Sequence, residues 1–169
     1  VVFRRLAVFV GGCTLEAAGA VAHAWGDLTL EPFEAIASLV DKSLLRQVTG
    51  RDSKTRYVML ETVREYGLEQ LAANGEEDRT RQQHADYYDD IIESITPTPR
   101  WPPTSERVRL IDAECDNLRA AMAWMLRIGD AERQLRLATR LFPLWRPLGH
   151  ISEGRRWLEQ GLLHGSPVP

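Results

Sequence analysis

One stretch of the chain has the alternation typical of β-strands, and it lies between segments of helical periodicity. Residues 43–60, SLLRQVTGRDSKTRYVML, place two apolar-alternating runs on either side of a polar, basic tip. We expect a β-hairpin with strands over about residues 44–48 and 56–60, and Gly50 and Asp52 suit its turn. The elements that precede this hairpin then decide the fold class.

Three short helices are predicted ahead of the hairpin. The first covers residues 3–10 and stops at a pair of glycines, Thr14 can cap the second, and Pro32 opens the third. The stripe expected to be buried on the third helix consists of Phe33, Ile36, Leu39, Val40 and Leu44. Three helices followed by a two-stranded hairpin is the order of a winged-helix domain, a helix-turn-helix variant whose hairpin is the wing.

The remainder of the chain is predicted to be helical. A fourth helix runs from Thr62 to a stop at Asn74 and Gly75, a fifth covers residues 76–95, and the proline-rich TPTPRWPP breaks it. The next two helices carry buried stripes at spacings of three and four: Val108, Ile111, Cys115, Leu118, Met122 and Met125, then Leu135, Ala138, Leu141, Phe142, Trp145 and Leu148. A last helix over residues 151–163 turns Trp157, Leu158 and Leu162 inward.

These patterns predict a mainly α protein in two parts. Residues 1–75 form a winged-helix domain with a small β-hairpin, and residues 76–169 form an antiparallel helical domain. Helix pairs joined by tight turns look like tetratricopeptide-type stacking, although the chain has no 34-residue self-similarity.

Composition restricts the class of protein further. The chain has 169 residues, 44% of them hydrophobic and 27% charged, and a formal net charge of −3, which suits a folded, soluble protein without a general basic excess. The sequence contains no apolar run long enough to cross a bilayer and no signal peptide, so a cytoplasmic location without membrane contact is expected. Because the sequence does not begin with Met, we expect this chain to be a piece of a longer protein.

The sequence predicts no catalytic site and no metal site. Cys13 and Cys115 lack a CxxC or Cys/His ligand spacing, and the four histidines include no i, i+4 pair. The chain has no GxxxxGK[ST] phosphate-binding loop, so we expect neither enzyme activity nor a cofactor in the chain itself.

Several strings resemble one family of signalling proteins. FRRLAVFVGGCTLEAAGAV, ASLVDKSLL, MLETVREYGLEQLAANGE, IDAECDNLRAAMAWML and LWRPLGHISEGRRWLEQGL are similar to the region after the nucleotide-binding module in bacterial STAND-class regulators. These are NB-ARC-related ATPases, often described as LuxR-type or AfsR-like transcriptional regulators. The resemblance implies a parent that binds ATP or ADP, a winged helix that packs on the nucleotide-binding module, and helical repeats that sense a protein or small-molecule effector.

The same resemblance implies a segment close to the nucleotide. NB-ARC proteins end their winged helix with a Met-His-Asp motif whose His reads the bound diphosphate. In this chain Met59 keeps the first position, Glu61 offers an acid in the third, and Leu60 replaces the His and cannot donate to a phosphate. Arg64, one turn along the same helix, could approach an anion, and the alternative is a solvated helix arginine.

The charge of the predicted third helix disfavours DNA binding, whereas the charge of the wing favours it. A helix that reads DNA needs basic and amide side chains, whereas the predicted third helix carries Glu31, Glu34 and Asp41 against Lys42. The wing offers four candidates for phosphate contacts: Arg46, Arg51, Lys54 and Arg56. Such contacts hold a backbone without specifying a sequence. We therefore expect a regulatory protein-interaction module, with DNA unlikely as a partner, and keep a DNA-binding winged-helix module of a transcription factor as the alternative.

The turn SEGRRWLEQ suggests a second binding surface. Arg155 and Arg156 could engage a phosphate or an acidic partner, and the alternative is that both face solvent. Trp145 and Trp157 fit helix–helix packing, with Gly154 allowing close approach, and the alternative is a ligand cage.

Overall fold

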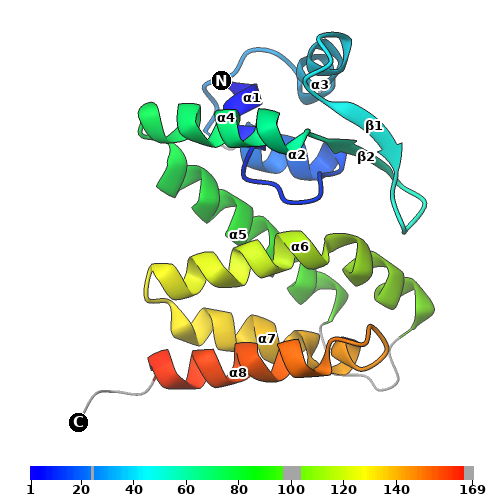
Figure 1. Ribbon diagram of the computed structural model, residues 1–169, viewed down its shortest axis with the longest axis vertical. Coiled ribbons are helices and arrows are strands. Elements are labelled where there is room, and N and C mark those ends of the chain that lie inside the picture. Colours follow the sequence, from blue (N-terminus) through cyan, green and yellow to red (C-terminus); the bar gives the residue numbers. More distant parts are fainter. Residues whose placement is uncertain (24, 97–103, 166–169) are drawn as a thin grey trace. The chain divides into compact units, whose positions relative to one another are not determined.

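The structure is a computed structural model that describes residues 1–23, 25–96 and 104–165. It divides into two compact units, residues 1–87 and 88–169, and the division falls within one long helix. The domain boundary expected at Gly75 from the sequence stays a prediction. The described residues form eight helices and one two-stranded sheet in the order drawn in Figure 1.

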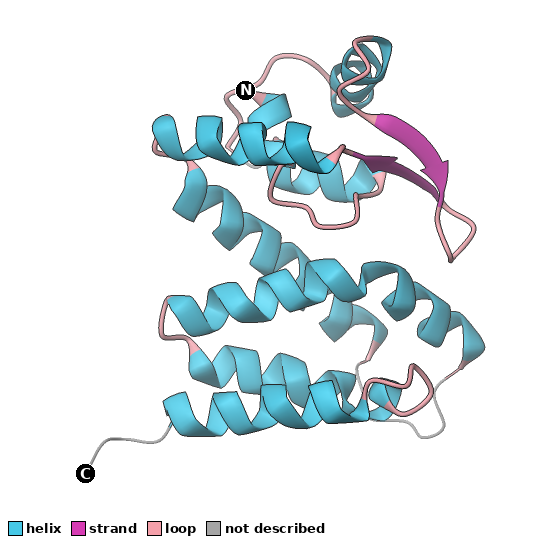
Figure 2. Ribbon diagram, viewed as in Figure 1, coloured by secondary structure: helices cyan, strands magenta, loops and turns pink. Residues whose placement is uncertain are grey.

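The first unit has the predicted winged-helix order. It contains α1 (Val2–Leu6), α2 (Leu15–Ala22), α3 (Pro32–Asp41), β1 (Arg46–Thr49), β2 (Thr55–Val58) and α4 (Glu61–Ala73). The strands, shown as the magenta arrows in Figure 2, pair antiparallel with Arg46 opposite Val58 and Thr49 opposite Thr55. The fold class inferred from the sequence is thereby confirmed.

Residues predicted to begin one helix and to end another do so in the structure. The Thr14 side chain accepts a hydrogen bond of 3.3 Å from the Ala17 N–H and caps α2. At the other end of the unit, α4 stops at Asn74, and Gly75 takes a positive φ of 67°. A left-handed residue after a helix suits glycine because it has no Cβ.

The turn between α1 and α2 is attached to the hairpin. Cys13 and Tyr57 exchange backbone hydrogen bonds of 3.0 and 2.8 Å, which add a short bridge beside β2. The close approach depends on Gly12, which has a φ of +89° and whose missing Cβ would come within 2.6 Å of the Tyr57 carbonyl oxygen. Gly12, one of the two glycines that end the first helical pattern, therefore also allows this contact with the hairpin.

Two details of the helices differ from the sequence expectation. The first helix ends at Leu6 rather than continuing to Val10, and the residues after it form a turn that is largely buried. The expected burial of Phe33 is wrong, because its side chain is 63% exposed while Ala35, Ile36 and Leu39 face the core. α3 needs only this narrow stripe, since it packs on α2 from one side.

A buried arginine links α1 to the residues after α2 and to a residue after α4. Arg5 of α1 is 0% exposed and donates to the Ala22 carbonyl at 2.9 Å and to Asp27 at 2.8 Å. It also contacts Glu76 at 3.3 Å, and its guanidinium lies 3.6 Å from the centre of a Trp25 ring. A buried guanidinium is tolerated because these acceptors satisfy its donors.

The second unit contains the C-terminal part of α5 (Glu77–Ile95), with α6 (Ser105–Arg127), α7 (Ala131–Trp145) and α8 (Ile151–Gly165). Figure 1 shows α6, α7 and α8 running antiparallel to their neighbours in sequence. Asp130 caps α7 by accepting from the Arg133 N–H at 3.2 Å, so the helix begins directly after the tight turn. The tetratricopeptide-like character expected for these helix pairs stays a prediction. The proline-rich break expected after α5 falls on residues 97–103, which lie outside the described residues.

The predicted stripes of the second unit are largely correct. Ile111, Leu118, Met122 and Met125 are buried along α6. On α7 and α8, however, the expected burial of Phe142 and Leu162 is wrong, because these side chains are 62% and 58% exposed. Both lie at the edge of the stripe, where a helix packed on one side leaves residues in solvent.

No described helix combines the length and apolar character that crossing a bilayer requires.

Candidate functional site

The outer surface of α3 is acidic and partly apolar. Glu31, Glu34 and Asp41 are exposed there, together with Phe33 at 63%. Lys42 is exposed after the helix and donates to Ser38 at 3.1 Å. A phosphate backbone that approached this surface would meet like charges.

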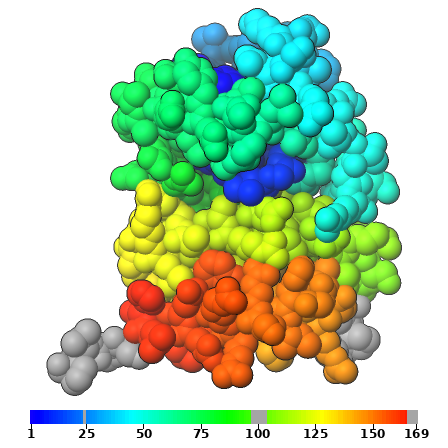
Figure 3. Space-filling view, in the orientation of Figure 1, coloured from blue at the N-terminus to red at the C-terminus, as the bar shows by residue number. Residues whose placement is uncertain are grey.

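The wing keeps three of its four predicted basic residues at the surface. Arg46, Arg51 and Lys54 are exposed, and the cyan atoms of α3 and the hairpin lie at the surface of the molecule in Figure 3. The expectation that Arg56 belongs to this exposed tip is wrong. Its side chain is 4% exposed, and its guanidinium donates to the Gly12 carbonyl at 3.0 Å. Arg56 points inward because it satisfies the carbonyl of the turn that the hairpin covers.

The segment expected near a nucleotide forms its own ion pair. Arg64 donates to Glu61 at 2.6 and 3.0 Å and to the Ala7 carbonyl at 3.3 Å. The hydrogen bond from Arg64 lowers the pKa of the Glu61 carboxyl. Met59 is half-buried, and Leu60 is 47% exposed just before α4. An anion near Arg64 would therefore compete with Glu61 for the guanidinium.

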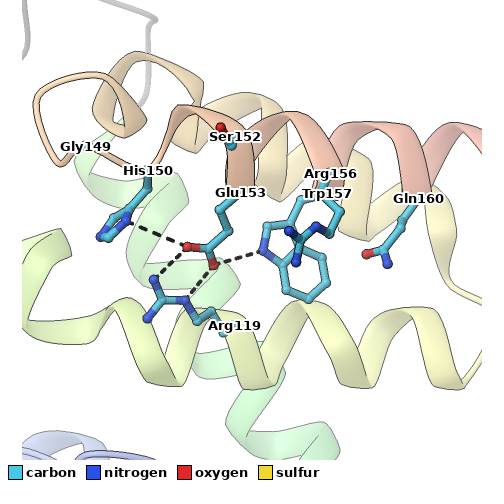
Figure 4. A pocket seen from close by; sticks show the side chains of 8 residues that line it. All are labelled: Arg119, Gly149, His150, Ser152, Glu153, Arg156, Trp157 and Gln160. Atoms are coloured by element: carbon cyan, nitrogen blue, oxygen red, sulfur yellow. Dashed lines mark hydrogen bonds and ion pairs between the residues drawn. The ribbon is translucent and has the colours of Figure 1, made fainter.

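The helical unit contains a polar pocket of about 530 Å³. α6 contributes one side chain, and the rest come from α8 and the two residues before it, as Figure 4 shows. The residues that line the pocket are Arg119, Gly149, His150, Ser152, Glu153, Arg156, Trp157 and Gln160.

One wall of this pocket is a charge network. Arg119 of α6 donates to both oxygens of Glu153 of α8, at 2.5 and 2.7 Å, and to Asp116 at 2.6 Å. The Trp157 indole N–H donates to the same Glu153 carboxylate at 3.3 Å. The hydrogen bonds from Arg119 lower the pKa of Glu153, and those from Glu153 raise the pKa of Arg119. Both groups stay charged at neutral pH and hold α6 against α8.

The two predicted binding arginines divide between different environments. Arg156 lines the pocket, whereas Arg155 is 80% exposed in its side chain and pairs with Glu159 at 2.6 Å. Arg119 and Gln160 also line the pocket, although the sequence argument did not select them for it. No local sequence signal places Arg119 beside α8, because that contact depends on helix packing across a long separation.

A second group of polar side chains lies next to the pocket. Asp112, Cys115 and His150 each offer one ligand atom, and these atoms lie within 4.8 Å of one another. Burial raises the pKa of the Cys115 thiol to about 11. Among the residues that the structure describes, this mixed set of donors could hold a metal ion.

The comparisons with known proteins agree with the fold of the first unit. Residues 1–72 match the family model of the winged helix-turn-helix domain. Together with the helix and hairpin order, this match defines that part of the chain as a winged-helix domain.

Known proteins are similar to this chain over most of its length. Proteins from Mycobacterium tuberculosis and Mycobacterium bovis with the provisional name HTH-type transcriptional regulator are 42% identical to it over 160 residues, or 93% of this chain. The chain spans 18% of the length of these relatives. It is thus homologous to one segment of much longer proteins. No solved structure matches the chain.

Proposed function

We propose that this chain is a regulatory protein-interaction segment of a transcriptional regulator. In this proposal the winged helix packs on another protein module, and the helical unit receives an effector. The observation that carries the proposal is the surface of α3, where both the ring of Phe33 and several carboxylates are exposed. Aromatic side chains are enriched in protein interfaces, and an exposed one can anchor a protein contact.

The STAND-type resemblance suggests which module that partner is. A nucleotide-binding ATPase module of the parent protein would pack against α3, and the nucleotide would be ATP or ADP. The Glu61–Arg64 pair supports a structural role for this segment rather than a phosphate contact, since Arg64 is already held by a carboxylate and a carbonyl. The small share of the relatives that the chain spans supports a larger parent.

The polar pocket supports an effector site on the helical unit. Its Arg119–Glu153 network fixes one wall, and the exposed side chain of Arg156 offers a cation to an acidic group. An acidic small molecule or an acidic peptide fits this chemistry, because a guanidinium binds carboxylates in a bidentate manner.

DNA binding is the second candidate, and two observations favour it. The relatives carry the name of transcriptional regulators, and Arg46, Arg51 and Lys54 are exposed on the wing. Three cations can hold phosphates, and each phosphate neutralised contributes about −0.9 to the slope of log K against log salt.

A duplex titration at low and high salt separates the two candidates. If the main proposal holds, fluorescence anisotropy detects little binding at low salt, and replacing Arg46, Arg51 and Lys54 by Ala changes it little. Salt-sensitive binding that this triple variant removes would support the DNA-binding function instead. Arg155→Ala is a control, because Arg155 is also exposed but belongs to the other unit.

Hydrogen exchange tests the protein contact directly. We expect amides of residues 31–42 to exchange more slowly in the full-length parent protein than in this 169-residue chain. Phe33→Ser should remove that protection. Equal exchange in both proteins would contradict packing through α3. A Walker-type phosphate-binding loop encoded ahead of Val1 would support the ATPase part of the proposal, and its absence would remove that part.

A further inference from the structure

Three side chains of different donor chemistry converge on one point of the helical unit. Asp112 and Cys115 come from α6, and His150 comes from the turn before α8. A carboxylate oxygen, a thiol sulfur and an imidazole nitrogen lie within 4.8 Å of one another. We propose that Asp112, Cys115 and His150 bind a zinc ion.

The backbone presents these three residues in a fixed arrangement. Asp112 and Cys115 are three residues apart on a helix and therefore share a face. The His150 N–H donates to the Trp145 carbonyl at 2.8 Å, and its carbonyl accepts from the Gly154 N–H at 2.9 Å, so its main chain is held by both α7 and α8. Tetrahedral zinc with these donors needs ligand atoms roughly 3.3–3.8 Å apart. Zinc binding would therefore draw the three atoms together through rotation of their side chains.

A small cavity of about 20 Å³ adjoins two of the three proposed ligands. Cys115 and His150 line it together with Glu153, Arg119 and mainly apolar side chains, and Asp112 is not among the residues that line it. A space of about 10–15 Å³ already holds one water molecule. A carboxylate oxygen of Glu153 lies 3.8 Å from the His150 Nδ1, but this carboxylate is held by Arg119, so a water molecule would supply the fourth ligand.

The charges around Cys115 have both signs. Among them the guanidinium of Arg119 has the largest effect on the thiol and opposes a cation, whereas the carboxylates of Asp112, Glu153 and Asp116 favour one. Arg119 is itself bound by Glu153 and Asp116, so its repulsion of an incoming ion is reduced. When zinc binds, the sulfur becomes a thiolate ligand and its proton passes to solvent.

The donor set distinguishes zinc from other common divalent ions. Magnesium and calcium prefer sites built from oxygen atoms alone, whereas one sulfur, one nitrogen and one oxygen donor suit zinc. The ion would tie α6 to the turn between α7 and α8. Because His150 also lines the polar pocket, zinc binding would change the wall that meets an effector.

Cobalt titration of the whole chain tests the proposal, and its two cysteines provide the control. We expect Co²⁺ to produce the near-ultraviolet absorption of a thiolate-to-cobalt charge transfer, which Zn²⁺ then removes by displacement. Cys115→Ser should lose this absorption, and Cys13→Ser should keep it, since Cys13 lies buried in the first unit. A wild-type protein without the band, or a band that only Cys13→Ser removes, would overturn the proposal.

The zinc affinity of histidine variants gives a second readout. Calorimetric titration near neutral pH should show zinc binding weakened by more than about tenfold in His150→Gln, since losing even a supporting group can cost that much. His164→Gln, at an exposed position of α8, should bind as the wild type does. Circular dichroism establishes that each variant is folded. Equal affinity in folded His150→Gln and wild type would exclude His150 as a ligand.

Thiol alkylation tests the unaltered protein. Zn²⁺ should slow the reaction of Cys115 with iodoacetamide by more than about tenfold, because a bound thiolate is shielded from the reagent. Magnesium at the same concentration should have no effect. Equal alkylation with and without Zn²⁺ would contradict the site.

Discussion

Gly154 of α8 lies directly against the indole ring of Trp145 of α7, so close that a Cβ at position 154 would overlap the ring atoms. Trp145 is 7% exposed, and most of its ring is therefore enclosed by this contact and its neighbours. The absence of a side chain at one position allows the largest side chain to fill the space between two helices. The packing of α7 on α8 thus depends on a glycine inside a helix.

We expect Gly154→Ala to destabilise the helical unit by about 1–3 kcal/mol, the usual cost of inserting a methyl group into a packed interior. The matched control is Gly19→Ala in α2, where the new Cβ would meet Pro32 at an ordinary 3.4 Å. That change should be neutral or stabilise by up to about 1 kcal/mol through helix propensity. Urea unfolding measures both, and a neutral Gly154→Ala would show that the ring can move aside.

The neighbours Leu141 and Phe142 should respond oppositely to truncation. Leu141 is 2% exposed and Phe142 is 62% exposed. Leu141→Ala should lower the free energy of unfolding by about 2–5 kcal/mol because it leaves a cavity. Phe142→Ala should cost less than about 1 kcal/mol, since it loses only an edge contact with Trp145. Thermal unfolding of the two variants measures both changes. A larger loss of unfolding free energy in Phe142→Ala than in Leu141→Ala would support the burial of Phe142 that the sequence predicted.

Arg56 and Arg46 provide a paired test of the hairpin. Arg56→Ala should destabilise the first unit by about 1–3 kcal/mol, because the buried Gly12 carbonyl loses the bond from its guanidinium. Arg46→Ala, at an exposed position of β1, should change stability by less than about 0.5 kcal/mol. Urea unfolding followed by circular dichroism measures both changes. Similar values for the two variants would mean that Arg56 has no structural role.

The stability of the first unit should fall in acid through Glu76. Hydrogen bonds from Arg4, and then from Arg5, hold the pKa of Glu76 at about 2, below its usual 4.5. A carboxylate whose pKa is lower in the folded than in the unfolded protein stabilises the fold fully at pH values above its unfolded-state pKa. This stabilisation is lost as the pH falls from about 4.5 to about 2. Glu76→Gln should therefore show a shallower loss of unfolding free energy over this range.

The neighbouring Glu77 supplies the control for that titration. Glu77 pairs with Arg81 four residues along α5, and both side chains are partly exposed. Glu77→Gln should keep the acid dependence of the wild type, because an exposed helix pair contributes little to stability. An unchanged acid slope in Glu76→Gln would show that Glu76 does not contribute to this loss.

Local patterns were sufficient for the order of the elements. Alternation in residues 43–60 predicts the hairpin, and Thr14 and Asn74-Gly75 mark helix ends that the structure has. These signals depend on backbone geometry within a few residues, which the sequence carries directly. The 3-4 spacing on α6 likewise predicts its buried face, as the burial of Leu118 and Met122 confirms.

The sequence determined the helices, the hairpin and the acidic character of α3, because periodicity, capping and charge are local properties. Only the tertiary structure decided which edge of each stripe reaches solvent, as with Phe33, and that Arg56 turns inward. It also brought His150 beside Cys115, although they lie far apart in the chain. Such contacts depend on how helices pack across long sequence separations, and no pattern within one helix specifies its neighbour.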